Sequence, residues 1–398
     1  MHFSLVPSLA LAVVPSFRVA IDGQANGGFV AESWGQFQQV SISPSRPDGI
    51  VVSNNNRLFA TDGLGQQEWG SVAYKKFDLL DRELSFDVDL SGVSCGCNGA
   101  VYLVEMGAPN QYNSGYCDIQ GFDSAPCLEI DLLEGNVKAV QATLHTTNGR
   151  GRDGESCNAD GCVAHLGREG TRLYGPQAAE GIDSRLPFTV SATFSETLEA
   201  DGNLGATYDV TLTQNDGART VHFFNPASAA GSHSTTGRPV PVPSGDRVRM
   251  RTALANKMTL VLSLWTADDL SWLDGGCDAV HSREEWHDAF PKCDLATARL
   301  AVSNLRTSAI PPPPHPPPSP HPSPPPPPPS PLSPPPPLHP PPPAPPQLLS
   351  TSSAANGLLV LAVLACIVFA AYRRMHPKMP PTRPMKPVDA RDLEDDED

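Results

Sequence analysis

The chain has 398 residues and a formal net charge of −15, with 43 acidic against 28 basic side chains. This acidic balance argues against nucleic acid as a partner, because nucleic-acid binding needs a basic surface. The nine cysteines form no CxxC repeat and no Cys/His cluster at zinc spacing, which argues against a structural zinc site. Eight of them lie between Cys95 and Cys293, an even number that predicts disulfides formed in an oxidising compartment.

The first segment along the chain is expected to be a secretory signal over about residues 1–20. An apolar stretch from Leu5 to Val14 follows Met1-His2, and cleavage is expected between about Ala12 and Ala20. The alternative interpretation of the same residues is a buried first strand.

Residues 21–308 have the pattern of one all-β domain. Leu84, Phe86, Val88 and Leu90 alternate with polar residues, which predicts a half-buried strand. Further strands are expected at 100–106, 128–133, 137–145, 188–194, 207–213, 220–224, 258–265 and 300–305, and the only helix at 282–290. Many strands with no βαβ rhythm predict a jelly-roll sandwich of two antiparallel sheets.

Three carboxylates stand in the strand-like run from Cys127 to Asn136, at Glu129, Asp131 and Glu134. Side chains alternate along a strand, so Glu129 and Asp131 share a face, whereas Glu134 at an odd offset points away unless a bulge returns it. Two carboxylates about 5 Å apart suit a retaining glycosidase, in which one attacks the anomeric carbon and the other protonates the leaving oxygen. The alternative is a set of surface or salt-bridged acids.

A proline-rich segment at about 309–350 follows the domain. Between Pro311 and Pro346, 26 of 36 residues are proline, so the segment can form only polyproline II, as a stiff extracellular stalk or, less readily, a ligand for SH3-type domains.

Residues 354–372 carry no charge and at 1.5 Å per residue span about 28 Å, which predicts one transmembrane helix. Arg373 and Arg374 follow at once, so residues 373–398 are expected in the cytosol. The protein is therefore predicted to be a single-pass type I membrane protein, with its large domain extracellular or luminal.

Several separate motifs follow one another along the chain. In order they are Glu83-Leu-Ser-Phe-Asp-Val-Asp-Leu-Ser, Cys95-Gly-Cys-Asn-Gly-Ala-Val-Tyr102, Gly115-Tyr-Cys-Asp118-Ile-Gln120, Glu129-x-Asp131-x-x-Glu134, Cys157-Asn-Ala-Asp-Gly-Cys162, Tyr174-Gly-Pro, Met258-Thr-Leu-Val-Leu-Ser-Leu-Trp265 with Trp272-Leu-Asp274, and Ser303-Asn304. Together they resemble the motifs of glycoside hydrolase family 7, the cellobiohydrolases and endoglucanases that cut cellulose. The resemblance spans about residues 79–308.

The resemblance implies a role for each matching residue. Glu129 becomes the nucleophile, Asp131 its hydrogen-bonding assistant and Glu134 the general acid/base, with no metal and no cofactor. The residues implied to contact substrate are Tyr102, Asp118, Gln120, His145, Trp265 and Trp272. A structural histidine and core tryptophans are the alternatives for the last three. The disulfides implied are Cys117–Cys127, Cys157–Cys162 and Cys95–Cys293, which leaves Cys97–Cys277.

The domain is shorter than typical family members, which implies that it lacks loops that roof the cleft. An open substrate cleft favours cleavage within the glucan chain. Leu133 stands where the family has a tryptophan before the acid/base glutamate, so the resemblance does not decide which glucan is the substrate. The activity expected is retaining hydrolysis of β-1,4-glucan such as cellulose, by a monomer. Alternatives are a β-1,3- or mixed-linkage glucanase or transglycosylase of wall remodelling, since the run also resembles the clan-related family 16, and a non-catalytic glucan-binding protein.

Overall fold

The computed structural model describes residues 13–24, 27–33, 40–43, 46, 48–64, 67–149, 156–167, 173–176, 178–224, 242–267, 269–275 and 293–310. The chain divides into two compact units, Met1–His315 and Pro316–Asp398. The second unit lies wholly outside the described residues, as do the predicted stalk beyond residue 310 and the predicted span at 354–372. Among the residues that are described, no helix has the length and apolar character needed to cross a bilayer.

Two large antiparallel sheets make up the described part of the first unit. The nine-stranded sheet runs, in sheet order, through β15 (Cys162–Leu166), β14 (Val140–His145), β13 (Glu129–Gly135), β10 (Asn98–Val104), β21 (Met258–Trp265), β6 (Asn56–Thr61), β3 (Gly28–Ser33) and β2 (Ser16–Arg18), with β8 (Lys76–Phe77) also paired to β21. The seven-stranded sheet runs through β20 (Arg219–Phe224), β19 (Leu204–Gln214), β18 (Phe188–Leu198), β9 (Arg82–Gly92), β22 (Arg299–Ala309), β5 (Ile50–Ser53) and β4 (Val40–Ile42).

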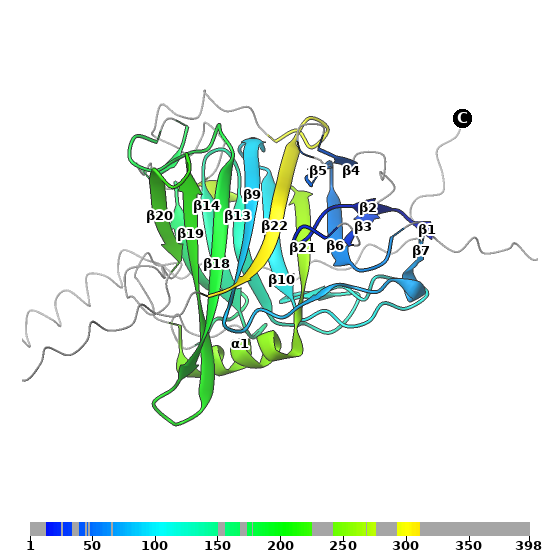
Figure 1. Ribbon diagram of the computed structural model, residues 1–398, viewed down its shortest axis with the longest axis vertical. Coiled ribbons are helices and arrows are strands. Elements are labelled where there is room, and N and C mark those ends of the chain that lie inside the picture. Colours follow the sequence, from blue (N-terminus) through cyan, green and yellow to red (C-terminus); the bar gives the residue numbers. More distant parts are fainter. Residues whose placement is uncertain are drawn as a thin grey trace, which may run out of the picture. The chain divides into compact units, whose positions relative to one another are not determined.

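Figure 1 shows the seven-stranded sheet in front of the nine-stranded one. Alternating apolar residues of both sheets meet between them in one core, to which β9 contributes Leu84, Phe86, Val88 and Leu90, as its sequence pattern predicts. The all-β sandwich of antiparallel sheets is therefore confirmed.

Three two-stranded sheets and the short helices complete the described elements. The small sheets pair β1 (Val13–Val14) with β7 (Gln67–Glu68), β11 (Cys117–Asp118) with β12 (Gly121–Phe122), and β16 (Tyr174–Gly175) with β17 (Ile182–Asp183). The helices are α1 (Ser244–Asn256), α2 (Ser271–Asp274) and a 3-10 turn at Trp69–Ser71.

Helix α1 was not expected from the sequence and packs on β19 (Figure 1). Its buried face holds Met250, Ala253 and Leu254 but begins with the carboxylate of Asp246, which hides the helical apolar period. The expectation of a single helix is therefore wrong, and the helix expected at 282–290 lies outside the described residues.

The start of the described chain also differs from expectation. β2 pairs with β3, and the side chains of Val14 and Val19 are 1% and 2% exposed. Residues 13–19 are thus part of the described fold, and the leader expected before a cleavage point between about Ala12 and Ala20 stays a prediction.

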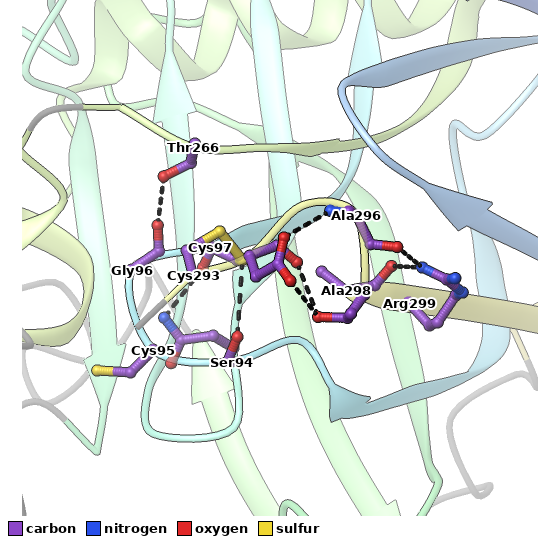
Figure 2. Close-up of a disulfide and its surroundings, with 12 residues drawn as sticks. Ser94, Cys95, Gly96, Cys97, Thr266, Cys293, Ala296, Ala298 and Arg299 are labelled. Atoms are coloured by element: carbon purple, nitrogen blue, oxygen red, sulfur yellow. Dashed lines mark hydrogen bonds between the residues drawn. A yellow bond between two sulfur atoms is a disulfide. The ribbon is translucent and has the colours of Figure 1, made fainter. Parts of the chain in front are cut away.

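Two of the expected disulfides, Cys117–Cys127 and Cys157–Cys162, are present. The expected Cys95–Cys293 and Cys97–Cys277 pairs are wrong, because Cys97 bonds Cys293 (Figure 2). Gly96, at φ +81°, turns the chain between the two cysteines, and Cys97 N–H donates to the carbonyl of Ser94. Cys95 is disulfide-bonded as well, and its Sγ lies 3.6 Å from Asp274 Oδ2.

Candidate active site

A β-bulge in β13 brings the three carboxylates to one face of the nine-stranded sheet. Asp131 lies opposite Thr143 of β14 and Glu134 opposite Gln141, so three steps on β13 match two on its partner. The extra residue lets Leu132 and Leu133 both turn into the core, where each is fully buried. A bulge of this kind reverses the strand alternation beyond it. We call the face that carries Glu129, Asp131 and Glu134 the site face.

Glu129 lies at the start of β13, opposite His145 of β14 and Val104 of β10. Its Oε2 accepts a hydrogen bond of 3.1 Å from the backbone N–H of Ile119, at the tip of the β11–β12 hairpin. Burial raises the pKa of Glu129 well above its usual value, the neighbouring Asp131 carboxylate raises it further, and His145 acts in the opposite direction. Because burial disfavours its charged form, a reaction in which this carboxylate forms a bond and loses its negative charge is favoured.

Asp131 is buried, 3% exposed, and its Oδ2 lies 3.4 Å from Nε2 of His145. The other ring nitrogen, Nδ1, lies 2.8 Å from the carbonyl oxygen of Asn158. A carbonyl only accepts, so Nδ1 carries a proton and Nε2 is the atom that faces Asp131. Burial, followed by the charge of Glu134, raises the pKa of Asp131 well above its usual value. Asp131 and His145 can therefore share one proton next to Glu129.

Glu134 is held by two side-chain amides. Asn98 Nδ2 donates to its Oε1 at 2.8 Å, and Gln141 Nε2 donates to its Oε2 at 2.9 Å. Burial raises the pKa of Glu134, while the bonds from Gln141 and Asn98 limit the rise because they favour the charged form. A carboxyl with a raised pKa that is also well oriented has the properties of a general acid.

The β11–β12 hairpin brings two further predicted residues next to Glu129. Asp118 is buried, accepts hydrogen bonds from Gln120 N–H and the Tyr116 hydroxyl, and has its pKa raised by burial. The side chain of Gln120 is exposed. Tyr102 lies opposite Asp131 on β10, is buried, and bonds the Tyr116 hydroxyl at 2.9 Å.

The two predicted tryptophans lie together, further along the site face. Their ring centroids are 6.3 Å apart, and both side chains are partly exposed, so neither is a core residue. Trp265 lies opposite Asn98, whose amide holds Glu134, and the carbonyl of Trp272 accepts from His165 Nε2. The pair therefore continues the site beyond Glu134.

Several site residues were missed by reasoning from the sequence. Asn98 and Gln141, which hold Glu134, gave no signal beyond polarity in a strand. Arg57 of β6, which lies in register with Glu134 through Ala100 and Ser263, places its guanidinium 3.6 Å from the centroid of the Tyr116 ring and pairs with Glu32 of β3 at 3.2 Å. A single arginine in the apolar run of β6 is a signal that could have identified Arg57 as a candidate site residue.

Glu129, Asp131 and His145 each place one donor atom within 4.8 Å of the others, a spacing that a divalent cation could bridge. Two carboxylates with burial-raised pKa values and a histidine in contact with one of them also suit acid–base and nucleophilic chemistry without a metal.

Comparisons with known proteins point to one family. The model of glycosyl hydrolase family 7 matches residues 66–126, a stretch that ends before Glu129. Endoglucanase EG-1 of Hypocrea jecorina is 28% identical over 330 residues, which cover 76% of this chain and 67% of that protein. The probable endo-β-1,4-glucanase celB of Aspergillus clavatus is 31% identical over 279 residues, covering 58% of this chain and 64% of that protein.

Among solved structures, a family 7 cellobiohydrolase from Daphnia pulex superposes with a TM-score of 0.50 at 17% identity, over 77% of this chain and 98% of that one. At this identity the match speaks for the fold alone. The chain is thus similar to glycosyl hydrolase family 7 over residues 66–126, to these two endoglucanases by sequence, and to a family 7 cellobiohydrolase by fold.

Proposed function

We propose that this protein is an endo-acting β-1,4-glucanase that hydrolyses cellulose or a related β-glucan with retention of configuration. The observation that carries the proposal is the bulge that gathers Glu129, Asp131 and Glu134 on the site face, each with the partners its role needs. The relatives named as endoglucanases support the substrate class and internal cutting.

In the proposed reaction Glu129 attacks the anomeric carbon and forms a glycosyl-enzyme, while Glu134 gives its proton to the departing glycosidic oxygen. Glu134 then takes a proton from water, whose oxygen attacks the anomeric carbon and releases Glu129. When Asp131 carries the proton it donates a hydrogen bond to Glu129, and His145 Nε2 takes up or returns that proton as the charge of Glu129 changes through the two steps. No metal or organic cofactor takes part.

The sugar chain is proposed to cross the strands along the site face. Tyr102, Asp118 and Gln120 would contact the sugar beside Glu129, and Trp265 and Trp272 would stack on rings beyond Glu134, because pyranose faces are apolar and bury well against aromatic ones. Arg57 of β6 and the Tyr116 ring beside it extend the same surface across the sheet, in register with Glu134.

The test is release of reducing ends by the purified protein from cellulose, mixed-linkage glucan and laminarin, with Glu129→Gln as the inactive comparison. Activity on cellulose that is lost in Glu129→Gln is expected. Activity on laminarin alone would move the protein to β-1,3-glucan remodelling, and binding without turnover would leave a glucan-binding protein. A fall in viscosity well ahead of reducing-end release would support internal cuts.

We further propose that the protein is a single-pass type I membrane protein whose stalk at 309–350 and span at 354–372 hold the domain outside the cytosol as a monomer. The uncharged span and the two arginines after it support this orientation. Resistance to extraction by alkaline carbonate, with a protease-sensitive tail at 373–398 on the cytosolic side, is the expected result.

A further inference from the structure

The loop closed by the Cys157–Cys162 disulfide lies directly behind His145. The carbonyl of Asn158 in this loop accepts from His145 Nδ1 at 2.8 Å and also from the N–H of Gly161 at 3.0 Å. Cys157 and Cys162 are 0% and 7% exposed, so the disulfide that closes the loop is buried. The histidine is thus held by a backbone atom of a short, cross-linked loop.

Gly161 lies close to Cε1 and Nδ1 of the histidine ring. Its φ is +75°, and a Cβ there would lie 2.7 Å from His145 Cε1 and 2.2 Å from Thr143 Cγ2. Contacts this short cannot be made without movement of the ring or of the strand that carries it. The loop therefore fixes the position of the imidazole as well as its tautomer.

Helix α1 fastens this loop through Asp246, whose side chain is 1% exposed. Asp246 Oδ2 accepts from the N–H of Cys157 at 3.0 Å, and Oδ1 accepts from the hydroxyl of Thr146, which follows His145. Thr146 N–H in turn donates to the carbonyl of Cys157 at 2.7 Å. One buried carboxylate thus joins the end of β14 to the start of the loop.

We propose that Asp246 is a positioning residue for the hydrolytic reaction, acting through the Cys157–Cys162 loop to hold His145 Nε2 against Asp131. The proposal rests on the proposed function for its kinetic consequence, since Asp131 matters there as the partner of Glu129. Asp246 touches neither the substrate nor the carboxylates, and it acts through the loop and the ring.

The first test compares Asp246→Ala with Asp246→Asn in the full-length protein. Asparagine can keep the network, because its Oδ1 accepts from Cys157 N–H while its Nδ2 donates to Thr146, whose hydroxyl also lies 3.2 Å from the Cys157 carbonyl. Alanine loses both of these bonds, and both variants lose the ion pair with Arg249, whose Nη1 lies 3.0 Å from Asp246 Oδ1. A misplaced catalytic group costs about a hundredfold in rate, so kcat should fall by about that factor in Asp246→Ala and recover in Asp246→Asn, with KM little changed.

The second test needs no change at Asp246 and compares Gly161→Ala with Gly202→Ala. Gly202 has a similar φ of +84°, but nothing lies within 4 Å of its would-be Cβ. Both variants therefore carry similar backbone strain, and only Gly161→Ala pushes on His145 and on Thr143 of the same strand. We expect a loss of kcat of about a hundredfold in Gly161→Ala and none in Gly202→Ala.

The readout that does not depend on turnover is the ¹⁵N spectrum of the imidazoles, with the His145 signals identified by their absence in His145→Gln. The parent protein should show Nδ1 protonated, and Asp246→Ala and Gly161→Ala should show this signature weakened. Unchanged His145 signals in both variants, or equal kcat in Gly161→Ala and Gly202→Ala, would overturn the proposal. If the parent cleaves no glucan, the proposed function fails, while the spectra still decide the positioning role.

If Asp246→Ala does not fold, the proposal is tested by Asp246→Asn and by the comparison of Gly161→Ala with Gly202→Ala. A hundredfold loss in Asp246→Asn with the His145 signature intact would also count against the proposal.

Discussion

Glu129 and Glu134 lie on the same face of β13 although they are five residues apart. The bulge at Leu132 and Leu133 produces this arrangement, since it adds one residue between Asp131 and Glu134 relative to β14. The two carboxyls then have different partners, a backbone N–H for Glu129 and two amides for Glu134. Different partners are what allows one to serve as nucleophile and the other as acid.

Substitution of Gln141 should move the alkaline limb of the pH profile. Gln141 donates to Glu134 and favours its charged form, so its removal raises the pKa of Glu134. The acid then stays protonated to higher pH, and in Gln141→Leu the alkaline limb of kcat/KM should move upward by about one pH unit, the equivalent of one bond to a charged group. The profile measured on a soluble cello-oligosaccharide checks this.

The acid limb reports on Glu129 and should move much less in Gln141→Leu. A downward shift of the alkaline limb, or an equal shift of both limbs, would show that Glu134 is not the acid.

How much of the site could be predicted depends on the kind of residue. The motifs predicted Glu129, Asp131 and His145 as one group, and neighbouring strands place one donor atom of each within 4.8 Å of the others. From the sequence, the bulge could be stated only as the condition for Glu134 to reach the same face, because the two leucines are equally compatible with a regular strand. Its presence is decided by the core, which buries both leucines.

Other features could not be predicted from the sequence because they depend on contacts between residues that are far apart in the chain. The partners of Cys95 and Cys97 are set by the turn at Gly96, which spacing does not reveal. Helix α1 was missed because one of its buried positions is Asp246, whose burial is compensated by Cys157 and Thr146. A buried carboxylate with partners from another element has no local signature.

Removal of the nucleophile should stabilise the fold. The pKa of Glu129 is raised in the folded state, so folding holds its proton more tightly than the unfolded chain does, and stability falls as pH rises above the usual glutamate value. Glu129→Gln removes this cost. Its free energy of unfolding at pH 7 should exceed that of the parent by at least about 1 kcal/mol, the low end of the cost of burying a polar group without full compensation, and the difference should vanish near pH 4.

Chemical denaturation at both pH values measures this difference. Glu83→Gln, on β9 of the other sheet, is the control for loss of a glutamate outside the site face. A Glu129→Gln variant that is less stable at pH 7 would mean that the charged form is favoured in the folded protein.

The Glu199–Arg247 pair should have the opposite pH dependence. Glu199 is 6% exposed, and hydrogen bonds from Arg247 of α1 lower its pKa to about 2. Its stabilising effect is therefore present above the usual glutamate pKa and is lost as pH falls towards 2. Glu199→Gln should cost about 2 kcal/mol at pH 7, the value of a bond between charged groups, and nothing near pH 2.

The matched control is Glu196→Gln, whose partner Arg251 also lies on α1. Counting the side chains alone, Glu196 and Arg251 are 29% and 32% exposed, whereas Glu199 and Arg247 are 3% and 24% exposed. A smaller loss is expected there because solvent screens the pair. Equal losses in both variants would contradict the role of burial.

Phe122 should bind a sugar ring at the end of the site face near Arg57. Its side chain is 62% exposed, yet its backbone has φ +138°, a conformation that is strained for a bulky residue. Its ring lies 5.7 Å from that of Tyr116 and 5.1 Å from the Arg57 guanidinium. Strain kept at an exposed aromatic residue is explained by a function rather than by packing.

Replacement by glycine separates the two effects, because glycine adopts this φ freely. Phe122→Gly should be at least as stable as the parent, since little packing is lost and the strain is relieved. Its KM for long cello-oligosaccharides should rise about fivefold, the equivalent of about 1 kcal/mol of aromatic contact, with kcat unchanged. Leu198→Ala, at a 75% exposed position on the other sheet, is the control and should leave KM unaltered. If KM in Phe122→Gly stays at the parent value for every chain length, the ring makes no contact with the sugar, and its strained backbone needs another explanation.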